Sequence, residues 1–189
     1  MQVLKEEVRE HILAAAVQVF YEKDFRSAKM QDIARLADVS ASLLYSYFEN
    51  KEKLFGAVVS SVPFDFDRIA REEESILADT PSERFRIAAE GPLLGMLAHH
   101  KLLVILVDKS QGTAYEHAKD DFVESIERHI RYMVNERARL RYPDLLAHVL
   151  ASNFVESLME VARHYSSEDE ARDMLALIAQ CYYEGVNSL

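Results

Sequence analysis

Residues 30–55 have the sequence MQDIARLADVSASLLYSYFENKEKLF. Apolar residues recur every three or four positions between 30 and 37, and this spacing predicts a helix of two turns. Residues 38–40 form a polar turn, and the Ser40 hydroxyl can accept a hydrogen bond from the first free amides of a following helix, 41–48. Two short helices joined by a three-residue turn have the layout of a helix-turn-helix, whose second helix enters the major groove of DNA.

Helices are also expected on both sides of this motif. From residue 6 to residue 22 the apolar positions step by three or four, which predicts an amphipathic helix with one buried stripe. Asp24 follows this helix in a position where aspartate often takes left-handed dihedrals. Asn50 offers a cap to a fourth helix that contains Leu54 and Phe55.

Further helix starts are marked along the rest of the chain. The segment Thr80-Pro81-Ser82-Glu83 combines a capping threonine, a proline at the first helical position and a glutamate at the third. The segments that begin at Thr113 and Ser167 repeat the S/T-x-x-E pattern, so we expect helices to start near 81, 114 and 168. Pro143 begins another helical run.

The composition agrees with a helical protein. Five glycines and four prolines in 189 residues are too few for the many tight turns of a β-sandwich or barrel. We therefore expect an all-α fold, with a helix-turn-helix domain over residues 1–50 and a helical ligand-binding and dimerisation domain over residues 51–189. The single Cys181 excludes an internal disulfide framework.

Two features bear on the compartment and on the partners. No run of about 18 apolar residues occurs and the first ten residues are mostly polar, so we expect neither a membrane span nor a secretory signal, and a cytoplasmic location. The net charge is −10, which usually speaks against a polyanion partner. However, residues 1–55 carry 8 basic and 9 acidic groups, so nearly all of the excess acid lies behind them. Acidic residues far from a DNA interface weaken DNA binding little, because salt screens the repulsion between charges over about 8 Å.

Signatures of enzymes are absent from the sequence. The five glycines stand too far apart for a dinucleotide-binding turn, a phosphate loop or a nucleophile elbow. A carboxylate-bridged metal pair needs Glu-x-x-His, and each of the seven histidines has an apolar residue three positions before it. We therefore expect no catalytic site, no metal and no cofactor.

Three segments carry a family resemblance. ILAAAVQVF (12–20), MQDIARLADVS (30–40) and LLYSYFENKEKLF (43–55) together resemble the tetracycline-repressor (TetR) family of transcriptional regulators. The N-terminal domain of that family typically has IL-x-AA-x-x-LF, then DIA-x-x-AGVS, then LY-x-YF-x-x-KE-x-L. The remaining two thirds are similar only in being helical and of the right length. The resemblance implies a ligand-responsive DNA-binding regulator, most often a repressor that a small molecule releases from a palindromic operator.

Physical reasoning assigns roles within the third helix. The phenols of Tyr45 and Tyr47 can reach phosphates, whereas Leu44 and Phe48, four positions apart, should pack on the first helix. Lys51 places a cation beside free helix-terminal amides, an arrangement that suits a phosphate.

Base edges should be read from the start of the same helix, where Leu43 can touch a thymine methyl group, and the resemblance implies that Lys29 holds a phosphate. The expected DNA contacts are Lys29, Gln31, Ser40, Ala41, Ser42, Leu43, Tyr45, Ser46, Tyr47 and Lys51. The alternative is that Tyr45, Tyr47 and Lys51 are ordinary core and surface residues of a helical bundle.

The sequence departs from the family pattern at five positions. Asp24 and Asp38 stand where the family prefers glycine, Ala28 and Lys29 replace the usual hydroxyl residues, and Glu49 stands where lysine is frequent. With a net charge of −1 over residues 1–55, the non-specific attraction to phosphates should be weak and salt sensitivity modest.

The resemblance further implies a homodimer with two recognition helices about one turn of DNA apart. Residues 145–162 and 174–186 are apolar on more than one face, as expected of helices that meet both their own domain and a partner subunit. The expected dimer contacts are Leu146, Leu150, Phe154, Leu158, Leu175, Ile178 and Tyr182.

We expect an apolar effector to enter a cavity lined by the middle helices and to favour a conformer that no longer fits DNA. Its candidate polar contacts are His99, His100, Tyr115, Asn153 and Glu156, each of which could equally be a structural residue. The segment DKSQGTAYEHA (108–118) is assigned no chemistry. A competing hypothesis is a small helical enzyme or carrier that binds an amphipathic cation or lipid through the acidic half.

Overall fold

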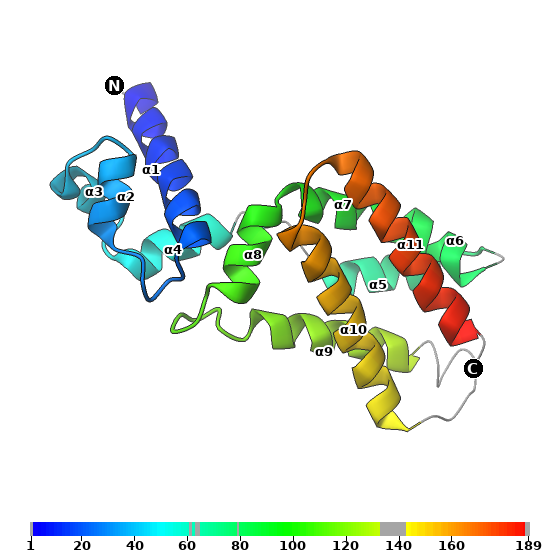
Figure 1. Cartoon of the computed structure of the whole chain (residues 1–189). Coiled ribbons are helices and arrows are strands. Elements are labelled where there is room, and N and C mark those ends of the chain that lie inside the picture. Colours follow the sequence, from blue (N-terminus) through cyan, green and yellow to red (C-terminus); the bar gives the residue numbers. More distant parts are fainter. Residues whose placement is uncertain (1, 61, 63–64, 79, 133–142, 188–189) are drawn as a thin grey trace. The chain divides into compact units, whose positions relative to one another are not determined.

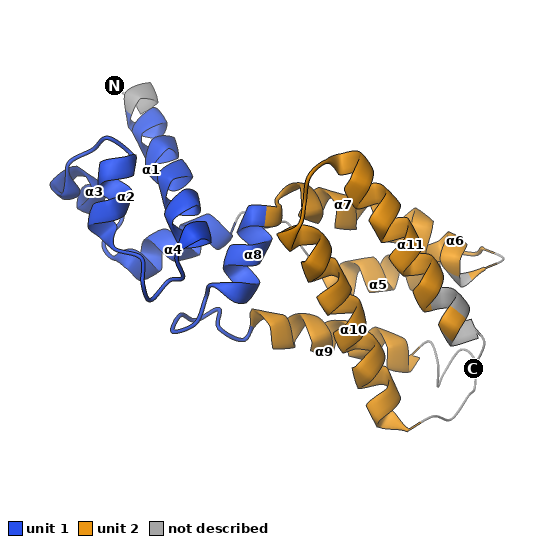
Figure 2. Cartoon of the chain, in the orientation of Figure 1, with its two compact units in different colours: residues 1–62, 101–117 blue, residues 63–100, 118–189 orange. Residues whose placement is uncertain are grey.

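The computed structural model describes residues 2–60, 62, 65–78, 80–132 and 143–187. All regular secondary structure in those residues is helical (Figure 1). The chain divides into two compact units, which Figure 2 colours separately. We call residues 1–62 and 101–117 the head unit, and residues 63–100 and 118–189 the bundle unit.

The head unit contains α1 (Gln2–Glu22), α2 (Met30–Leu36), α3 (Ala41–Tyr47) and α4 (Lys51–Val59). Its core is built on α1 residues four positions apart, because Ile12, Ala16 and Phe20 are fully buried. The Phe20 ring meets the Phe55 ring edge-on, with 5.1 Å between the centroids. Fully burying one such large side chain stabilises a domain by about 1.5–3 kcal/mol, so this cluster holds the short helices in place.

Local capping sets the ends of the short helices as the sequence predicts. The Ser40 hydroxyl accepts a hydrogen bond from the Leu43 amide at 3.1 Å, and the Asn50 side chain accepts one from the Lys53 amide at 2.8 Å. The expectation for Asp24 is wrong: its carboxylate accepts from the Ser27 amide at 2.7 Å, and the backbone there is not left-handed. Among the described non-glycine residues, Asp38 alone has a positive φ, of 54°.

A helix from the middle of the chain completes the head. Residues 101–108 of α8 (His100–Asp108) belong to this unit, and Ile105 is fully buried in the same core as Phe20. The Phe25 amide donates to the carbonyl oxygen of Lys109 at 2.9 Å. The unit therefore extends past residue 50 to include α4 and residues 101–117, because distant segments share one apolar core.

The bundle unit consists of six helices in the described residues: α5 (Phe66–Ser75), α6 (Pro81–Ala88), α7 (Glu90–Ala98), α9 (Ala118–Arg131), α10 (Asp144–Arg163) and α11 (Glu168–Asn187). The helix starts predicted near 81 and 168 are confirmed, and the Thr80 hydroxyl accepts from the Glu83 amide. The start predicted near 114 is wrong. Thr113 instead accepts from the Tyr115 amide within a turn, and α9 begins at Ala118.

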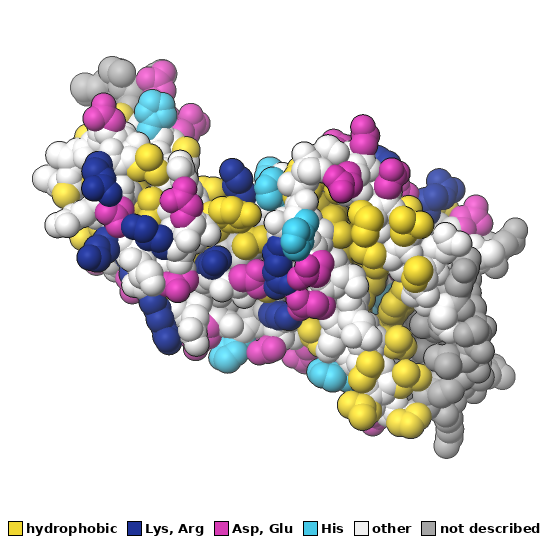
Figure 3. Space-filling view, viewed as in Figure 1, with side chains coloured by type: hydrophobic (Ala, Val, Ile, Leu, Met, Phe, Trp, Pro, Cys, Tyr) yellow, Lys and Arg dark blue, Asp and Glu magenta, His cyan; other side chains and the backbone are white. Residues whose placement is uncertain are grey.

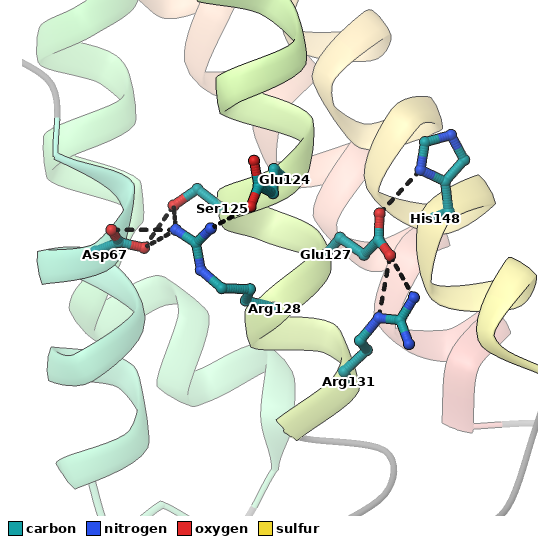
Figure 4. A network of polar contacts seen from close by, with 7 residues as sticks. All are labelled: Asp67, Glu124, Ser125, Glu127, Arg128, Arg131 and His148. Carbon is teal, nitrogen blue, oxygen red and sulfur yellow. Dashed lines mark hydrogen bonds and ion pairs between the residues drawn. The ribbon is translucent and has the colours of Figure 1, made fainter.

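Ion pairs join α9 to helices on both sides (Figure 4). Arg128 donates to Asp67 of α5 at 3.0 Å, while Glu127 accepts from Arg131 and lies 2.9 Å from the Nδ1 atom of His148 on α10. The hydrogen bonds from Ser125 and Arg128 hold the pKa of Asp67 below its usual value. These contacts keep α9 aligned between α5 and α10.

Helix α10 is long and apolar enough, by length and composition, to cross a membrane, although no uninterrupted apolar run is present. In the bundle unit its buried side chains, among them Ala151, Val155 and Leu158, pack inside the unit next to α9 and α11. Core helices of soluble proteins have the same length and composition.

Candidate functional site

Helix α3 is buried on one side and open on the other. Leu44 is fully buried and Phe48, its C-terminal cap, is nearly so, as the four-residue spacing predicts. The side chains of Ala41, Ser42, Leu43, Tyr45 and Ser46 are exposed, with exposed fractions of 40 % for Leu43 and 51 % for Tyr45. The helix therefore presents small, hydroxyl and apolar side chains to an external surface.

The two tyrosines of α3 differ in their surroundings. Tyr45 is exposed, whereas Tyr47 is half-buried and packs against the head core. The Ser46 hydroxyl donates to the Leu43 carbonyl oxygen at 2.7 Å, and the Ser40 hydroxyl caps the helix. Of the phenols predicted to contact phosphates, Tyr45 is the more accessible.

The start of α2 lies on the surface of the same unit. Lys29 and Gln31 are exposed, and Lys29 is the N-terminal cap residue, with no side-chain hydrogen bond to the helix. Asp32 accepts from Lys23 at 2.8 Å and from Arg35 at 3.0 Å. The Lys23 hydrogen bond lowers the pKa of Asp32, so this acid of the motif is already paired with basic groups.

Lys51 is directed into the head. Its ammonium donates to the carbonyl oxygens of Phe25 at 2.6 Å and Ala28 at 2.9 Å, and more weakly to that of Arg26 at 3.4 Å. The sequence predicted a phosphate contact for this cation. In the structure it instead holds the turn that precedes α2, a partnership between residues more than 20 positions apart that helical spacing does not indicate.

The unassigned segment after α8 is an ordered turn of the head unit. The Ser110 hydroxyl donates to the Tyr115 carbonyl oxygen, and the Thr113 hydroxyl donates to the Ser110 carbonyl oxygen. The centroid of the Tyr115 ring lies 6.1 Å from that of the Phe55 ring. A Cβ atom added at Gly56 would lie only 3.3 Å from the Tyr115 hydroxyl oxygen. Glycine at position 56 therefore permits the close packing of this turn on α4.

The bundle unit contains a small, partly open apolar cavity of about 60 Å³. Its lining comes from all six helices of the unit: Phe66, Ile69, Ala70, Glu73, Phe85, Ala89, Leu93, Ser125, Ile126, His129, Ile130, Phe154 and Tyr182. The sequence pattern identified none of the polar lining residues as effector contacts. Glu73 and Ser125 lie in amphipathic helices, and the helical pattern does not mark which polar side chain turns inward.

Charged side chains meet at one part of this cavity. The Nε2 atom of His129 is 3.4 Å from a carboxylate oxygen of Glu73, and its Nδ1 atom is 3.3 Å from one of Glu74. Burial by itself would lower the pKa of His129, but the hydrogen bonds and charges of the two glutamates outweigh burial and raise it above 6.5. Burial also raises the pKa of the Tyr182 phenol, whose ordinary value already keeps it protonated at neutral pH.

Residues 12–58 match the model of a protein family described as bacterial regulatory proteins, tetR family. The matched segment runs from Ile12 of α1 to Val58 of α4, and so includes the whole helix-turn-helix. The helix-turn-helix segment of this chain is thus of the tetR-family type.

Curated proteins are similar to part of the chain. The HTH-type transcriptional regulator TtgR of Pseudomonas putida is 36 % identical over 70 residues, which are 37 % of this chain and 33 % of that protein. The HTH-type transcriptional repressor NicS of Pseudomonas putida is 35 % identical over 78 residues, 41 % of this chain and 36 % of that protein. The chain thus matches about a third of the length of these relatives.

Solved structures extend the likeness of fold to nearly the whole chain. NalD of Pseudomonas aeruginosa, the secondary repressor of a multidrug efflux pump, has a TM-score of 0.58 at 20 % identity. The superposition covers 93 % of this chain and 95 % of the NalD chain. A TetR-like regulator from Rhodococcus has a TM-score of 0.63 at 24 % identity, and the superposition covers 92 % of this chain and 94 % of that one. The likeness of fold therefore includes the bundle unit.

The predicted effector contacts do not line the cavity. His99 and Asn153 are exposed, Tyr115 belongs to the head unit, and His100 stacks on Tyr165 with 4.3 Å between the ring centroids. Glu156 pairs with Lys119 and Arg163. The prediction chose polar residues from the middle of the chain, whereas the fold directs other side chains inward.

Several of the predicted dimer residues lie inside the bundle unit and not on its surface. Phe154, Leu158 and Leu175 are buried within the bundle unit and Tyr182 lines its cavity, so these four are not available to a partner, whereas Leu146, Leu150 and Ile178 are partly exposed. The large apolar residues exposed on the same two helices are Leu145, Val149, Met174 and Leu177. Hydrophobic side chains gather over α10 and α11 in Figure 3.

Proposed function

We propose that this chain is a ligand-responsive transcriptional regulator that binds a palindromic DNA operator as a homodimer and is released by a small molecule, as a repressor. The observation that supports this most directly is the exposed face of α3 in a head unit that matches the tetR family. Ala41, Ser42, Leu43 and Ser46 would face base edges, with Leu43 against a thymine methyl group. Such a protein acts in the cytoplasm, where bacterial DNA is found.

Phosphate contacts would come from Tyr45, Lys29 and Gln31, with Ser40 at the head of α3. Tyr47 would contribute through its half-buried edge, and Lys51 would act by fixing the turn before α2. The repressor role follows the relatives named as transcriptional repressors, among them NicS.

Dimerisation would use the apolar face of α10 and α11 around Leu145, Val149, Met174 and Leu177, together with the partly exposed Leu146, Leu150 and Ile178. Two such helices from each subunit form a four-helix bundle, and its two-fold axis sets the spacing of the recognition helices on DNA. The effector would bind in the bundle-unit cavity, and it shifts the equilibrium only by the difference of its affinities for the two conformers.

Selection of duplexes from a random-sequence pool by the purified chain tests the proposal. We expect enrichment of a palindrome, and Tyr45→Ala should weaken binding to it about fivefold or more, the loss of a hydrogen bond of roughly 1 kcal/mol. Gln18→Ala is the matched control, because Gln18 is exposed on α1 and bonds to Glu22. A chain that enriches no sequence, or whose Tyr45→Ala and Ser42→Ala variants both bind as tightly as the parent, would contradict the proposal.

A further inference from the structure

The outward face of α3 lacks the side chains that usually identify a base. The seven residues of this helix carry hydroxyl or hydrocarbon side chains, and none is arginine, lysine, asparagine, glutamine, aspartate or glutamate. In the major groove, arginine and lysine recognise guanine, asparagine and glutamine recognise adenine, and the two acids recognise cytosine. Helix α3 therefore has to discriminate bases by other means.

The basic side chains that flank α3 in the sequence are engaged within the head unit. Arg35, before the helix, donates to Asp32 at 3.0 Å. Lys51, after the helix, donates to the carbonyl oxygens of Phe25 and Ala28. These contacts hold both cations to other parts of the head, so neither takes the place of a guanine-binding residue on α3.

The two serines of the outward face give little choice between bases. The Ser46 hydroxyl donates its proton to the Leu43 carbonyl oxygen at 2.7 Å, so its oxygen is left to accept from an amino group, which adenine and cytosine both present. The Ser42 hydroxyl can either donate or accept, and so it suits any base edge. Contact through these hydroxyls is compatible with several sequences.

Leu43 is different, because it is a large apolar side chain on the outward face. It is 40 % exposed, whereas the next residue, Leu44, is fully buried. Its backbone is fixed at both ends, since its amide donates to the Ser40 hydroxyl at 3.1 Å and its carbonyl oxygen accepts from Ser46. The apolar group that base edges offer to such a side chain in the major groove is the 5-methyl group of thymine.

We propose that α3 selects its operator chiefly through a thymine methyl group in each half-site, with Leu43 as the specificity-determining residue. This inference rests on the proposed function, in which α3 enters the major groove of a palindromic operator. It adds the chemical class of the partner: a duplex that is recognised by a methyl group rather than by the hydrogen-bonding pattern of guanine or adenine.

The test uses the palindromic duplex that the selection experiment enriches, with uracil in place of individual half-site thymines. Uracil pairs with adenine as thymine does and lacks only the methyl group. We expect uracil at the position that faces Leu43 to weaken binding about fourfold in one half-site and about tenfold or more in both, as the loss of one buried methyl group per half-site implies. At the same position 5-methylcytosine, which has the methyl group, should bind more tightly than cytosine. Fluorescence anisotropy titrations measure these affinities.

Two variants separate a contact with the methyl group from a general effect of uracil. Leu43→Ala should bind the thymine and uracil duplexes equally, because the side chain that meets the methyl group is gone. Leu77→Ala is the matched control and should keep the difference, since Leu77 is 97 % exposed and lies outside the head unit. Circular dichroism verifies that both variants are folded.

The outcomes distinguish this inference from the proposed function. An enriched palindrome whose affinity no uracil changes, or a preference for thymine that survives in folded Leu43→Ala, would overturn the inference and leave the proposed function standing. A chain that enriches no duplex would overturn both.

Discussion

The ammonium of Lys51 lies 2.6 Å from the carbonyl oxygen of Phe25 and 4.4 Å from the centre of the Phe25 ring. One cation thus holds both the backbone and the side chain of a residue 26 positions earlier. Since Phe25 also packs edge-on against Phe55, the start of α4 and the turn before α2 form one rigid assembly. The orientation of α2, and hence of α3, depends on this assembly.

Replacing Lys51 should therefore destabilise the protein. We expect Lys51→Met to lower the free energy of unfolding by about 2 kcal/mol, because partly buried carbonyl oxygens lose a charged donor. Urea denaturation followed by circular dichroism measures the change, and Lys53→Met, at an exposed position of the same helix, should change it by less than about 0.5 kcal/mol. Unchanged stability together with a smaller salt dependence of DNA binding would instead identify Lys51 as a phosphate contact.

The left-handed backbone at Asp38 predicts a stabilising substitution. Left-handed dihedrals cost an L-residue roughly 1 kcal/mol and cost glycine nothing, so Asp38→Gly should raise the free energy of unfolding by up to about 1 kcal/mol. Asp38→Val should lower it, because a branched side chain tolerates positive φ least. Thermal unfolding of the two variants beside the parent decides the matter, and a lower melting temperature for Asp38→Gly would refute the backbone argument.

The exposed apolar face of α10 and α11 makes the proposed dimer testable. Placing glutamates there with Val149→Glu and Leu177→Glu should shift the chain toward monomers by at least tenfold in dissociation constant, because each charge would lose water without gaining a partner. Light scattering coupled to size-exclusion chromatography reports the mass. Leu77→Glu is the matched control, since Leu77 is 97 % exposed and lies outside α10 and α11. A double variant that remains dimeric would exclude this face as the seam.

The contacts of His129 predict how stability changes with pH. The two glutamates raise its pKa in the folded chain above the ordinary value of 6.5, so the folded state holds the proton more tightly than the unfolded state. This contribution is fully present below pH 6.5 and is lost as the pH rises through the raised pKa. Denaturation from pH 5.5 to 8 should show a fall in stability that His129→Gln abolishes, and parallel curves for the two proteins would contradict it.

Helix ends and the buried side of α3 could be predicted from local patterns. Ser40, Asn50 and Thr80 cap their helices because a cap needs only the amides of the next turn, which lie within three residues. Leu44 and Phe48 are buried because a four-residue spacing puts them on one side of α3. These features depend on neighbours in the sequence and on the helical period alone.

Local patterns suffice to predict the all-α class, most of the helix starts, the caps and the outward face of α3, whereas the start predicted near 114 was wrong. Packing between distant segments places Ile105 in the core of the head, bonds Lys51 to the turn at Phe25, and brings Glu73 and His129 to one cavity. The physical reason is separation along the chain: Glu73 and His129 are 56 positions apart, and no helical or strand period relates such residues before their helices pack.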